Sequence, residues 1–188
     1  IDKYGADTLR TYLMFLGPFD AGGDFRDTGI AGMFRFLSRV WRLVTESLKD
    51  TSDGGPERSR RDSSRRRHSL WRRTAEVEES IKRFMHKAIK EVTEDMENFR
   101  YNTAIAHIME YVNALTHNSQ LITHNSIKAL LLLLAPFAPH MTEELWERIK
   151  KQEVRSTVRE AKSTRDSLFV IRDSIHLAPW PKYDPKYL

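Results

Sequence analysis

Three arginines in the first quarter of the chain are the side chains best suited to bind a polyanion. Arg35, Arg39 and Arg42 are separated by four and then three residues, so on a helix they share one face. Guanidinium groups held in a row on a rigid helix can contact the phosphates of a nucleic-acid backbone. A solvated helix face explains the same spacing nearly as well, and both interpretations stay open. Glu46 lies four residues beyond Arg42 and is placed to pair with it.

No pattern of catalytic residues accompanies these cations. The seven histidines do not form an HExxH motif or a close cluster with carboxylates, so we expect no metal site and interpret them as structural or solvated. A Gly-x-Ser-x-Gly nucleophile motif is absent. The pair Gly22-Gly23 lacks the lysine and hydroxyl residue of a phosphate-binding loop. We therefore expect no catalytic residue in this chain.

An arginine-rich tract holds most of the excess positive charge. Between Arg58 and Arg73 there are eight arginines and one acid, and without this tract the remaining 23 basic and 25 acidic residues nearly balance. Such a tract is typical of a solvated loop. It could also contact RNA phosphates loosely, or present Ser63 and Ser69 to a basophilic kinase.

The composition indicates a soluble globular protein. The 188 residues are 40% hydrophobic and 30% charged, with a net charge of +5, which is enough for one domain with a core. No apolar run reaches the roughly 20 residues that cross a bilayer, so we expect no membrane association. Cysteine is absent, which suits a reducing compartment. We expect a cytoplasmic location, with an organelle as the alternative.

Apolar residues recur at helical spacing through most of the chain. A first helix is predicted from Ala6 to Leu16. The clearest stripe follows in the next helix, whose inward residues are Ile30, Met33, Phe34, Leu37, Val40, Trp41, Val44 and Leu48. A third helix, predicted to begin near Leu70, turns Val77, Ile81, Met85, Ala88, Ile89, Val92 and Met96 inward and Arg83, Lys87 and Lys90 outward. A fourth carries Ile105, Ile108, Met109, Val112 and Leu115.

Local signals predict where the later helices begin. Asn102 and Ser126 are candidate N-caps. Thr142 is a third candidate, with Glu143 and Glu144 in the first turn that follows and Met141 closing onto Trp146. The last segment, 175–181, is predicted to be extended and packed by Trp180. Trp41 and Trp146 lie on apolar stripes and are expected in the core.

These elements predict an all-α antiparallel bundle, because strand-like alternation and internal repeats are both lacking. We divide it into a junction at 1–25, a helical bundle at 26–151 with a flexible Arg/Ser-rich insertion at about 50–69, and a charged insertion with an extended C-terminal segment at 152–188. The first residue is not methionine, so we expect a piece of a larger protein.

Several stretches resemble leucyl-tRNA synthetases, a family of class I aminoacyl-tRNA synthetases. They are Tyr4 to Arg10, Gly17 to Asp20, Arg35 to Trp41, Lys87 to Ala106, Leu131 to Arg148 and Ser174 to Pro181. Isoleucyl, valyl and methionyl relatives share the Pro-Phe-x-Pro-x-x-x-Glu-Glu-x-Trp pattern, whereas Gly-Pro-Phe-Asp and Arg-Phe-Leu-x-Arg-Val-Trp favour leucine.

The resemblance implies the helical bundle called the anticodon-binding domain of that family. Its partners would be tRNA(Leu) and the enzyme's own upstream catalytic domain, which makes leucyl-adenylate from ATP with Mg and transfers leucine to the tRNA 3′ end. The HIGH and KMSKS motifs of that domain do not occur here, and zinc and editing modules would also lie upstream. The bundle would position the tRNA for chemistry elsewhere.

In that family, the stretch that matches Tyr4 to Arg10 directly follows the catalytic loop. The resemblance implies that this stretch is a junction through which docking of the bundle affects the active site. The candidate tRNA-binding residues, as phosphate contacts, are Arg35, Arg39, Arg42, Lys87 and Lys90. Two alternatives remain: a non-enzymatic helical interaction module, and the same domain of an isoleucyl-, valyl- or methionyl-tRNA synthetase.

Overall fold

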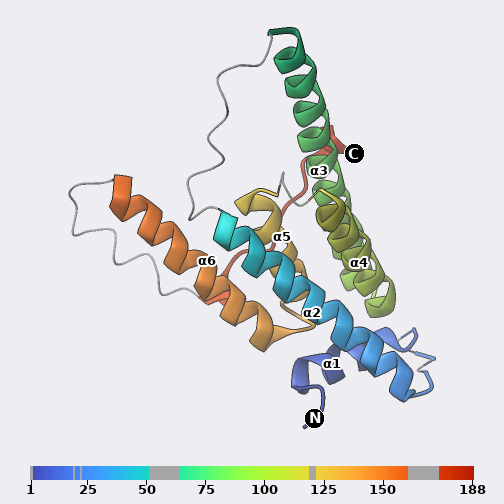
Figure 1. The fold of residues 1–188 in the computed structure, drawn as a ribbon. Helices are drawn as coiled ribbons and strands as arrows, with labels where there is room; N and C mark the ends of the chain where they lie inside the picture. The colour runs from blue at the N-terminus through green and yellow to red at the C-terminus, as the bar shows by residue number, and fades with distance from the viewer. Residues whose placement is uncertain (1, 19, 22, 51–63, 119–121, 161–173) are drawn as a thin grey trace.

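The computed structural model describes residues 2–18, 20–21, 23–50, 64–118, 122–160 and 174–188, and within them it contains helices and no strand (Figure 1). The elements are α1 (Ala6–Phe15), α2 (Asp27–Asp50), α3 (Ser64–Glu97), α4 (Tyr101–His117), α5 (His124–Leu134), α6 (Pro139–Glu160) and the short 3-10 turns η3 (Ile175–Leu177) and η4 (Pro185–Tyr187). The predicted all-α class is confirmed.

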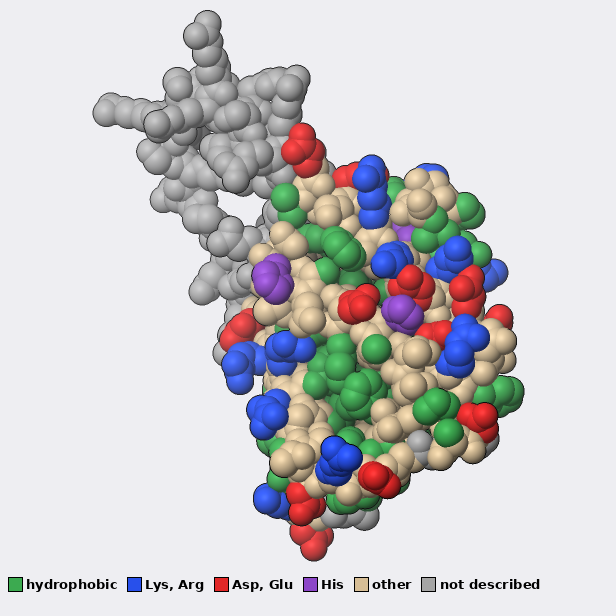
Figure 2. All heavy atoms as spheres, turned by 90° about the vertical axis from the view of Figure 1, so that its right-hand side faces the viewer, with side chains coloured by type: hydrophobic (Ala, Val, Ile, Leu, Met, Phe, Trp, Pro, Cys, Tyr) green, Lys and Arg blue, Asp and Glu red, His purple; other side chains and the backbone are tan. Residues whose placement is uncertain are grey.

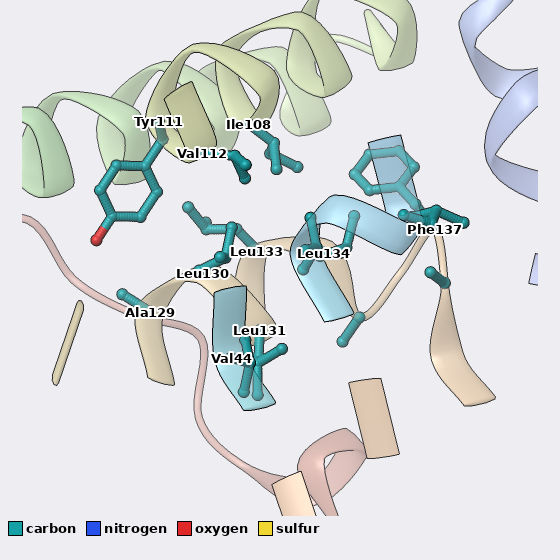
Figure 3. Close-up of a cluster of buried hydrophobic side chains, with 14 of the residues drawn as sticks. Val44, Ile108, Tyr111, Val112, Ala129, Leu130, Leu131, Leu133, Leu134 and Phe137 are labelled. Atoms are coloured by element: carbon teal, nitrogen blue, oxygen red, sulfur yellow. The ribbon is translucent and has the colours of Figure 1, made fainter. Parts of the chain in front are cut away.

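The shortest of the later helices, α5, forms the centre of the core. Leu130, Leu131, Leu133 and Leu134 of this helix are fully buried, because α3, α4 and α6 all pack against it. Figure 3 shows these leucines meeting Ile108 and Val112 of α4 and Val44 of α2. Burial of each such side chain stabilises the fold by roughly 1.5 to 3 kcal/mol. The core therefore holds α2 and α4 in fixed positions.

A tight turn joins α3 and α4 into a helical hairpin. Phe99 has a positive φ of 57°, and the N–H of Arg100 donates to the carbonyl of Asp95 at 2.8 Å. The N–H of Phe99 donates to the carbonyl of Met96 at 3.3 Å, which completes a Schellman motif. The motif has a phenylalanine where glycine is usual, so the left-handed backbone is strained here.

The predicted beginning of the third helix was six residues too late. α3 begins at Ser64 rather than near Leu70, so part of the expected insertion at 50–69 is helical. The segment 64–69 contains neither glycine nor proline, and arginine is a good helix former. The rest of the insertion, 51–63, lies outside the described residues, as does 161–173.

The buried face of α2 is rotated from the predicted stripe. Phe36 and Leu43 are buried, whereas Phe34, which we expected inward, leaves 43% of its surface exposed. Trp41 is half-buried at the edge of the same face. The exposed edge of α2 carries apolar residues because it lines a groove between α1, α2 and α6. Helical periodicity responds to apolar residues wherever they lie, and it therefore assigned this edge to the core.

Two predicted caps are displaced along the chain. Thr123, not Ser126, caps α5, since its hydroxyl oxygen accepts a hydrogen bond from the Ser126 N–H at 3.2 Å. Asn102 lies inside α4, whose N-cap position is Arg100 and has no side-chain cap. Thr123 is extended and can turn its hydroxyl onto the first turn, a geometry that sequence spacing does not reveal.

The predicted cap of α6 was also wrong. The helix begins at Pro139, because proline lacks an N–H and has a φ suited to the first helical position. Thr142 is therefore buried inside the helix, and its hydroxyl donates to the carbonyl of Ala138 at 3.0 Å. Glu143 and Glu144 consequently lie beyond the first turn of α6. Because Thr142 is not the cap, Met141 and Trp146 do not form the predicted hydrophobic staple.

The C-terminal segment crosses from α6 to α3, where the chain ends (Figure 1). Only its beginning departs from the predicted extended chain, since Ile175–Leu177 form the turn η3. Ile175 rather than Trp180 is its buried anchor. Glu143 accepts hydrogen bonds from the Ser174 hydroxyl at 2.7 Å and the Ile175 N–H at 3.0 Å. The indole N–H of Trp180 donates to the Thr93 hydroxyl at 2.8 Å.

Candidate nucleic-acid interface

The arginine row on α2 is exposed and has no acidic partner. Arg35, Arg39 and Arg42 all project into solvent, and none makes an ion pair with a carboxylate in the described part of the chain. The expected pairing of Arg42 with Glu46 does not form. The guanidinium carbon of Arg39 lies 5.9 Å from the Phe36 ring centroid. Three uncompensated cations thus lie along about 10 Å of one rigid helix.

The predicted lysines of α3 have a different environment. Lys87 lies 3.6 Å from Glu91 and Lys90 lies 4.0 Å from Glu94, each four residues further along the helix. Figure 2 looks onto the right-hand side of Figure 1, where α3 and α4 lie, and shows basic and acidic side chains interspersed there. Such exposed pairs contribute at most about 1 kcal/mol, but they cancel much of the local positive potential. The lysines therefore attract a phosphate less strongly than the arginines of α2.

The structure does not bring the five predicted residues together on one helix face. α2 packs against α1, α4 and α6, whereas α3 packs against α4, α5 and η4. The arginine row and the two lysines consequently belong to separate sides of the bundle. A ligand that touches both groups must reach from one side of the bundle to the other.

Beside the arginine row, α1, α2 and the beginning of α6 enclose a groove of about 650 Å³. Its lining is mainly apolar and includes Tyr4, Phe34, Leu37, Trp41 and Met141. The Tyr4 and Phe34 rings lie 5.6 Å apart at 54°. Sequence analysis missed this groove, because it forms only where three segments that are distant in sequence meet.

Trp41 has a cationic partner from another helix. The guanidinium carbon of Arg148 lies 4.6 Å from the Trp41 ring centroid, a cation–π contact. The Arg148 Nε also donates to Glu144 at 2.8 Å. Trp146 is buried as predicted, whereas Trp41 is half-buried and lines the groove. The prediction for Trp41 was therefore only partly correct.

A carboxylate from α1 fixes the beginning of α6 at the groove. Asp7 accepts a hydrogen bond from the Met141 N–H at 2.7 Å and is 2.9 Å from the His140 ring nitrogen. It also accepts from Arg10 at 2.7 Å. An anion at a helix N-terminus is stabilised by unpaired N–H groups and by the helix dipole. Asp7 thus performs the capping role that we had assigned to Thr142.

A charged cluster joins α3 and α4 near their turn. The His107 ring nitrogens lie 3.2 Å from Glu91 and 3.5 Å from the buried Asp95. Asp95 also accepts from the Arg100 guanidinium at 2.8 Å. Within the described ranges, no group of three His, Cys, Asp or Glu side chains has the arrangement to hold a metal ion. We interpret the cluster as a structural link between the two helices.

The described helices also include none that is long and apolar enough to span a membrane. An all-α bundle with an uncompensated arginine row on the solvent-facing side of one helix is a kind of domain that can bind RNA phosphates. The chain belongs to a family of such domains: residues 78–188 match the family described as the anticodon-binding domain of tRNA ligase.

Relatives and a solved structure extend the similarity to nearly the whole chain. The leucine–tRNA ligase of Chlorobium phaeovibrioides is 40% identical over 186 residues, which are 99% of this chain and 18% of that protein. The Synechocystis leucine–tRNA ligase is 38% identical over 191 residues, 99% of this chain and 19% of that protein. The chain thus spans about a fifth of the length of these relatives.

The solved structure is the ternary complex of Agrobacterium radiobacter K84 agnB2 LeuRS with tRNA and LeuAMS. It aligns with a TM-score of 0.69 and 28% identity over 98% of this chain and 21% of that chain. The likeness includes α1 and α2, which lie outside the family match at 78–188. The helix that carries the arginine row is therefore part of the shared fold.

Proposed function

We propose that this chain is the tRNA-binding, or anticodon-binding, domain of a leucine–tRNA ligase. The observation that carries the proposal is the exposed row of Arg35, Arg39 and Arg42, which has no acidic partner in the described part of the chain. Leucine is supported by the two relatives above and by the solved complex, which are named as leucine enzymes. The enzyme would be a longer polypeptide, of which this chain supplies no catalytic residue.

In this function the bundle binds and orients tRNA(Leu). The arginines contact phosphates and contribute affinity without reading sequence. Lys87 and Lys90 make secondary contacts once their carboxylate partners are displaced. Binding energy from this remote site then holds the tRNA 3′ end in register for aminoacylation. ATP with Mg is used by the catalytic domain elsewhere on the polypeptide, in the cytoplasm.

The domain division follows the same proposal. Residues 1–25 form the junction to the catalytic domain and 26–151 form the tRNA-binding bundle. The third division is 152–188, of which the described segment 174–188 packs on the bundle. The capping of α6 by Asp7 supports a junction that is firmly attached to the bundle.

The test measures tRNA binding by the full-length enzyme as a function of salt. Each lost phosphate contact flattens the slope of log K against log salt by about 0.7 to 0.9. The triple variant Arg35→Ala/Arg39→Ala/Arg42→Ala should therefore lose about 2 units of slope, and the loss should be similar for different tRNA sequences.

The variant for comparison is Lys87→Ala/Lys90→Ala, which removes the two secondary contacts, whose cations are already offset by carboxylate partners. Its slope should change by less than about 1 unit. An unchanged affinity and slope in the arginine variant would rule out the α2 face. Aminoacylation of purified tRNAs with leucine, isoleucine, valine and methionine settles the amino acid, and leucine is the expected product.

A further inference from the structure

A second cavity lies between α3 and the turn η4. Its volume is about 520 Å³, within the range of about 300 to 1,000 Å³ that is usual for sites of small ligands. One face of α3, between Ser80 and Glu94, lines it together with Tyr187 and Leu188. Figure 1 shows this last part of the chain beside the middle of α3. The cavity therefore forms only when the C-terminal segment packs on α3.

The wall that η4 contributes is held in place by contacts with α3. The Tyr187 ring stacks on the His86 ring, with centroids 4.7 Å apart and planes inclined by 4°. The Asp184 N–H donates to the Nδ1 atom of His86 at 3.1 Å. A ligand would meet a wall that is already ordered, so little conformational entropy would be lost on binding.

An exposed aromatic ring lies in this cavity beside two cations. Phe84 is 45% exposed and belongs to the lining. Arg83 and Lys87 also line the cavity, and they lie one residue before and three residues after Phe84 on the same helix. A flat apolar ring next to positive charge is the arrangement on which proteins stack the bases of single-stranded nucleic acids.

The cations of this face are loosely held. Each has a carboxylate partner four residues away on α3: Arg83 with Glu79 at 3.9 Å, Lys87 with Glu91 at 3.6 Å and Lys90 with Glu94 at 4.0 Å. These distances exceed the roughly 3.2 Å of a good hydrogen bond, and the three basic side chains are 39% to 67% exposed. Each can therefore turn toward a phosphate at little cost.

The mixed charge of the lining selects against a plain row of phosphates. Glu91 and Glu94 line the cavity as well, and their carboxylates would repel the backbone of a duplex stem. The same carboxylates can accept hydrogen bonds from the N–H groups on the edge of a base, which a nucleotide exposes only when it is unpaired. The lining thus suits a ligand that combines one phosphate, one flat ring and N–H donors.

We propose that this cavity binds one unpaired nucleotide of the bound tRNA, with the base stacked on Phe84 and the phosphate between Arg83 and Lys87. The proposal rests on the function proposed above and extends it, because the arginine row of α2 contacts phosphates without reading bases. The cavity and the row belong to separate sides of the bundle. A tRNA held at both places is fixed in orientation as well as in position.

The experiment measures the affinity of the full-length enzyme for tRNA(Leu) after the ring is removed. Stacking of one base corresponds to a factor of about 5 to 140 in affinity. We expect Phe84→Leu to weaken binding about tenfold and to leave the salt slope unchanged, because no charge is lost. Phe84→Trp keeps a stacking surface and should bind within about twofold of the unsubstituted enzyme.

The matched control is Leu177→Ala, which removes an apolar side chain that is 77% exposed and lies outside the cavity. Its affinity for tRNA should not change. The urea midpoint of each variant is measured as well, and it should stay constant because Phe84 and Leu177 are both exposed. Normal affinity in Phe84→Leu overturns the proposal. So does a weaker affinity that comes with a flatter salt slope, since that result would indicate lost phosphate contacts.

Ultraviolet cross-linking of the unsubstituted complex identifies the occupant directly. After nuclease digestion, mass spectrometry should find one nucleotide on the peptide that contains Phe84, and it should come from an unpaired position of the tRNA. A nucleotide from a base-paired stem, or no nucleotide at all, overturns the proposal. Cross-linking of free CMP without any cross-link from tRNA would assign the cavity to a mononucleotide and would overturn it too.

The two proposals can fail separately. A flattened salt slope in the arginine variant of α2 combined with normal affinity in Phe84→Leu would leave the tRNA-binding function supported and refute the nucleotide site. An unchanged slope in the arginine variant combined with weaker binding and a cross-link at Phe84 would support the nucleotide site and refute the α2 face.

Discussion

Removing the Asp7 carboxylate should loosen the attachment of α1 to α6. Asp7 accepts hydrogen bonds from the Met141 N–H and from Arg10, and its side chain is only 12% exposed. Asp7→Ala leaves the first turn of α6 without its acceptor, which costs about 1 kcal/mol. Loss of a charge at the helix N-terminus costs about 0.5 kcal/mol more.

The exposed partners add little to this cost. His140 is mostly exposed, and Arg10 is partly exposed, so each pair contributes at most about 1 kcal/mol. We therefore expect Asp7→Ala to lower the free energy of unfolding by about 2 kcal/mol. With a urea m-value of about 2 kcal/mol/M, the unfolding midpoint should fall by about 1 M.

Urea unfolding followed by circular dichroism at constant salt provides the measurement. Asp7→Asn keeps an oxygen acceptor and should cost less than half as much. Glu144→Ala removes an exposed ion pair of similar length, 2.8 Å to Arg148, and should cost at most about 0.5 kcal/mol. If Asp7→Ala were no more destabilising than Glu144→Ala, the capping of α6 from α1 would have no energetic importance.

Three further perturbations test other contacts. The pKa of His86 is lowered below its ordinary 6.5, mainly by burial and against the opposing effect of Asp184. The unfolded chain therefore binds more protons than the folded chain, so stability rises with pH around the ordinary histidine pKa. The protection factors of amides in the C-terminal segment, which are corrected for the intrinsic exchange rate at each pH, should fall between pH 7.5 and 5.5, and His86→Gln should remove that dependence. Phe99→Gly should raise the free energy of unfolding by about 1 kcal/mol, because glycine adopts the left-handed backbone of this position without strain and the side chain that is lost is 62% exposed. A lower unfolding midpoint in urea would contradict the presence of strain at Phe99. Tyr111→Phe removes the buried hydrogen bond to the Ser126 carbonyl at 3.0 Å and should cost about 1 kcal/mol in thermal unfolding, whereas no change would show that the hydroxyl is not needed.

Most of the positions that helical periodicity assigned to the core are buried. Ile81, Ile89 and Val92 of α3 are buried as expected, and so are Ile105 and Ile108 of α4. These positions repeat every three or four residues, so a single apolar stripe indicates both the helix and its inward face. The period of an α-helix is a local property, and for that reason it can be recognised before any partner is known.

Helix ends were predicted less well than helix faces. Thr142 looked like a cap in the sequence, but Pro139 begins the helix and Asp7 supplies the acceptor. Thr123 replaced Ser126 at α5 for a similar reason. A cap depends on the backbone angle of one residue and on side chains that approach from elsewhere, neither of which is encoded in spacing.

For the candidate site, the sequence established which residues carry charge and which helix face they share. Arg35, Arg39 and Arg42 lie on one face because a helix turns once every 3.6 residues. Only the folded chain distinguished them from Lys87 and Lys90, whose charges are offset by neighbouring glutamates. The groove also belongs to the tertiary structure alone, because its walls come from segments more than 100 residues apart that meet only when the core has formed.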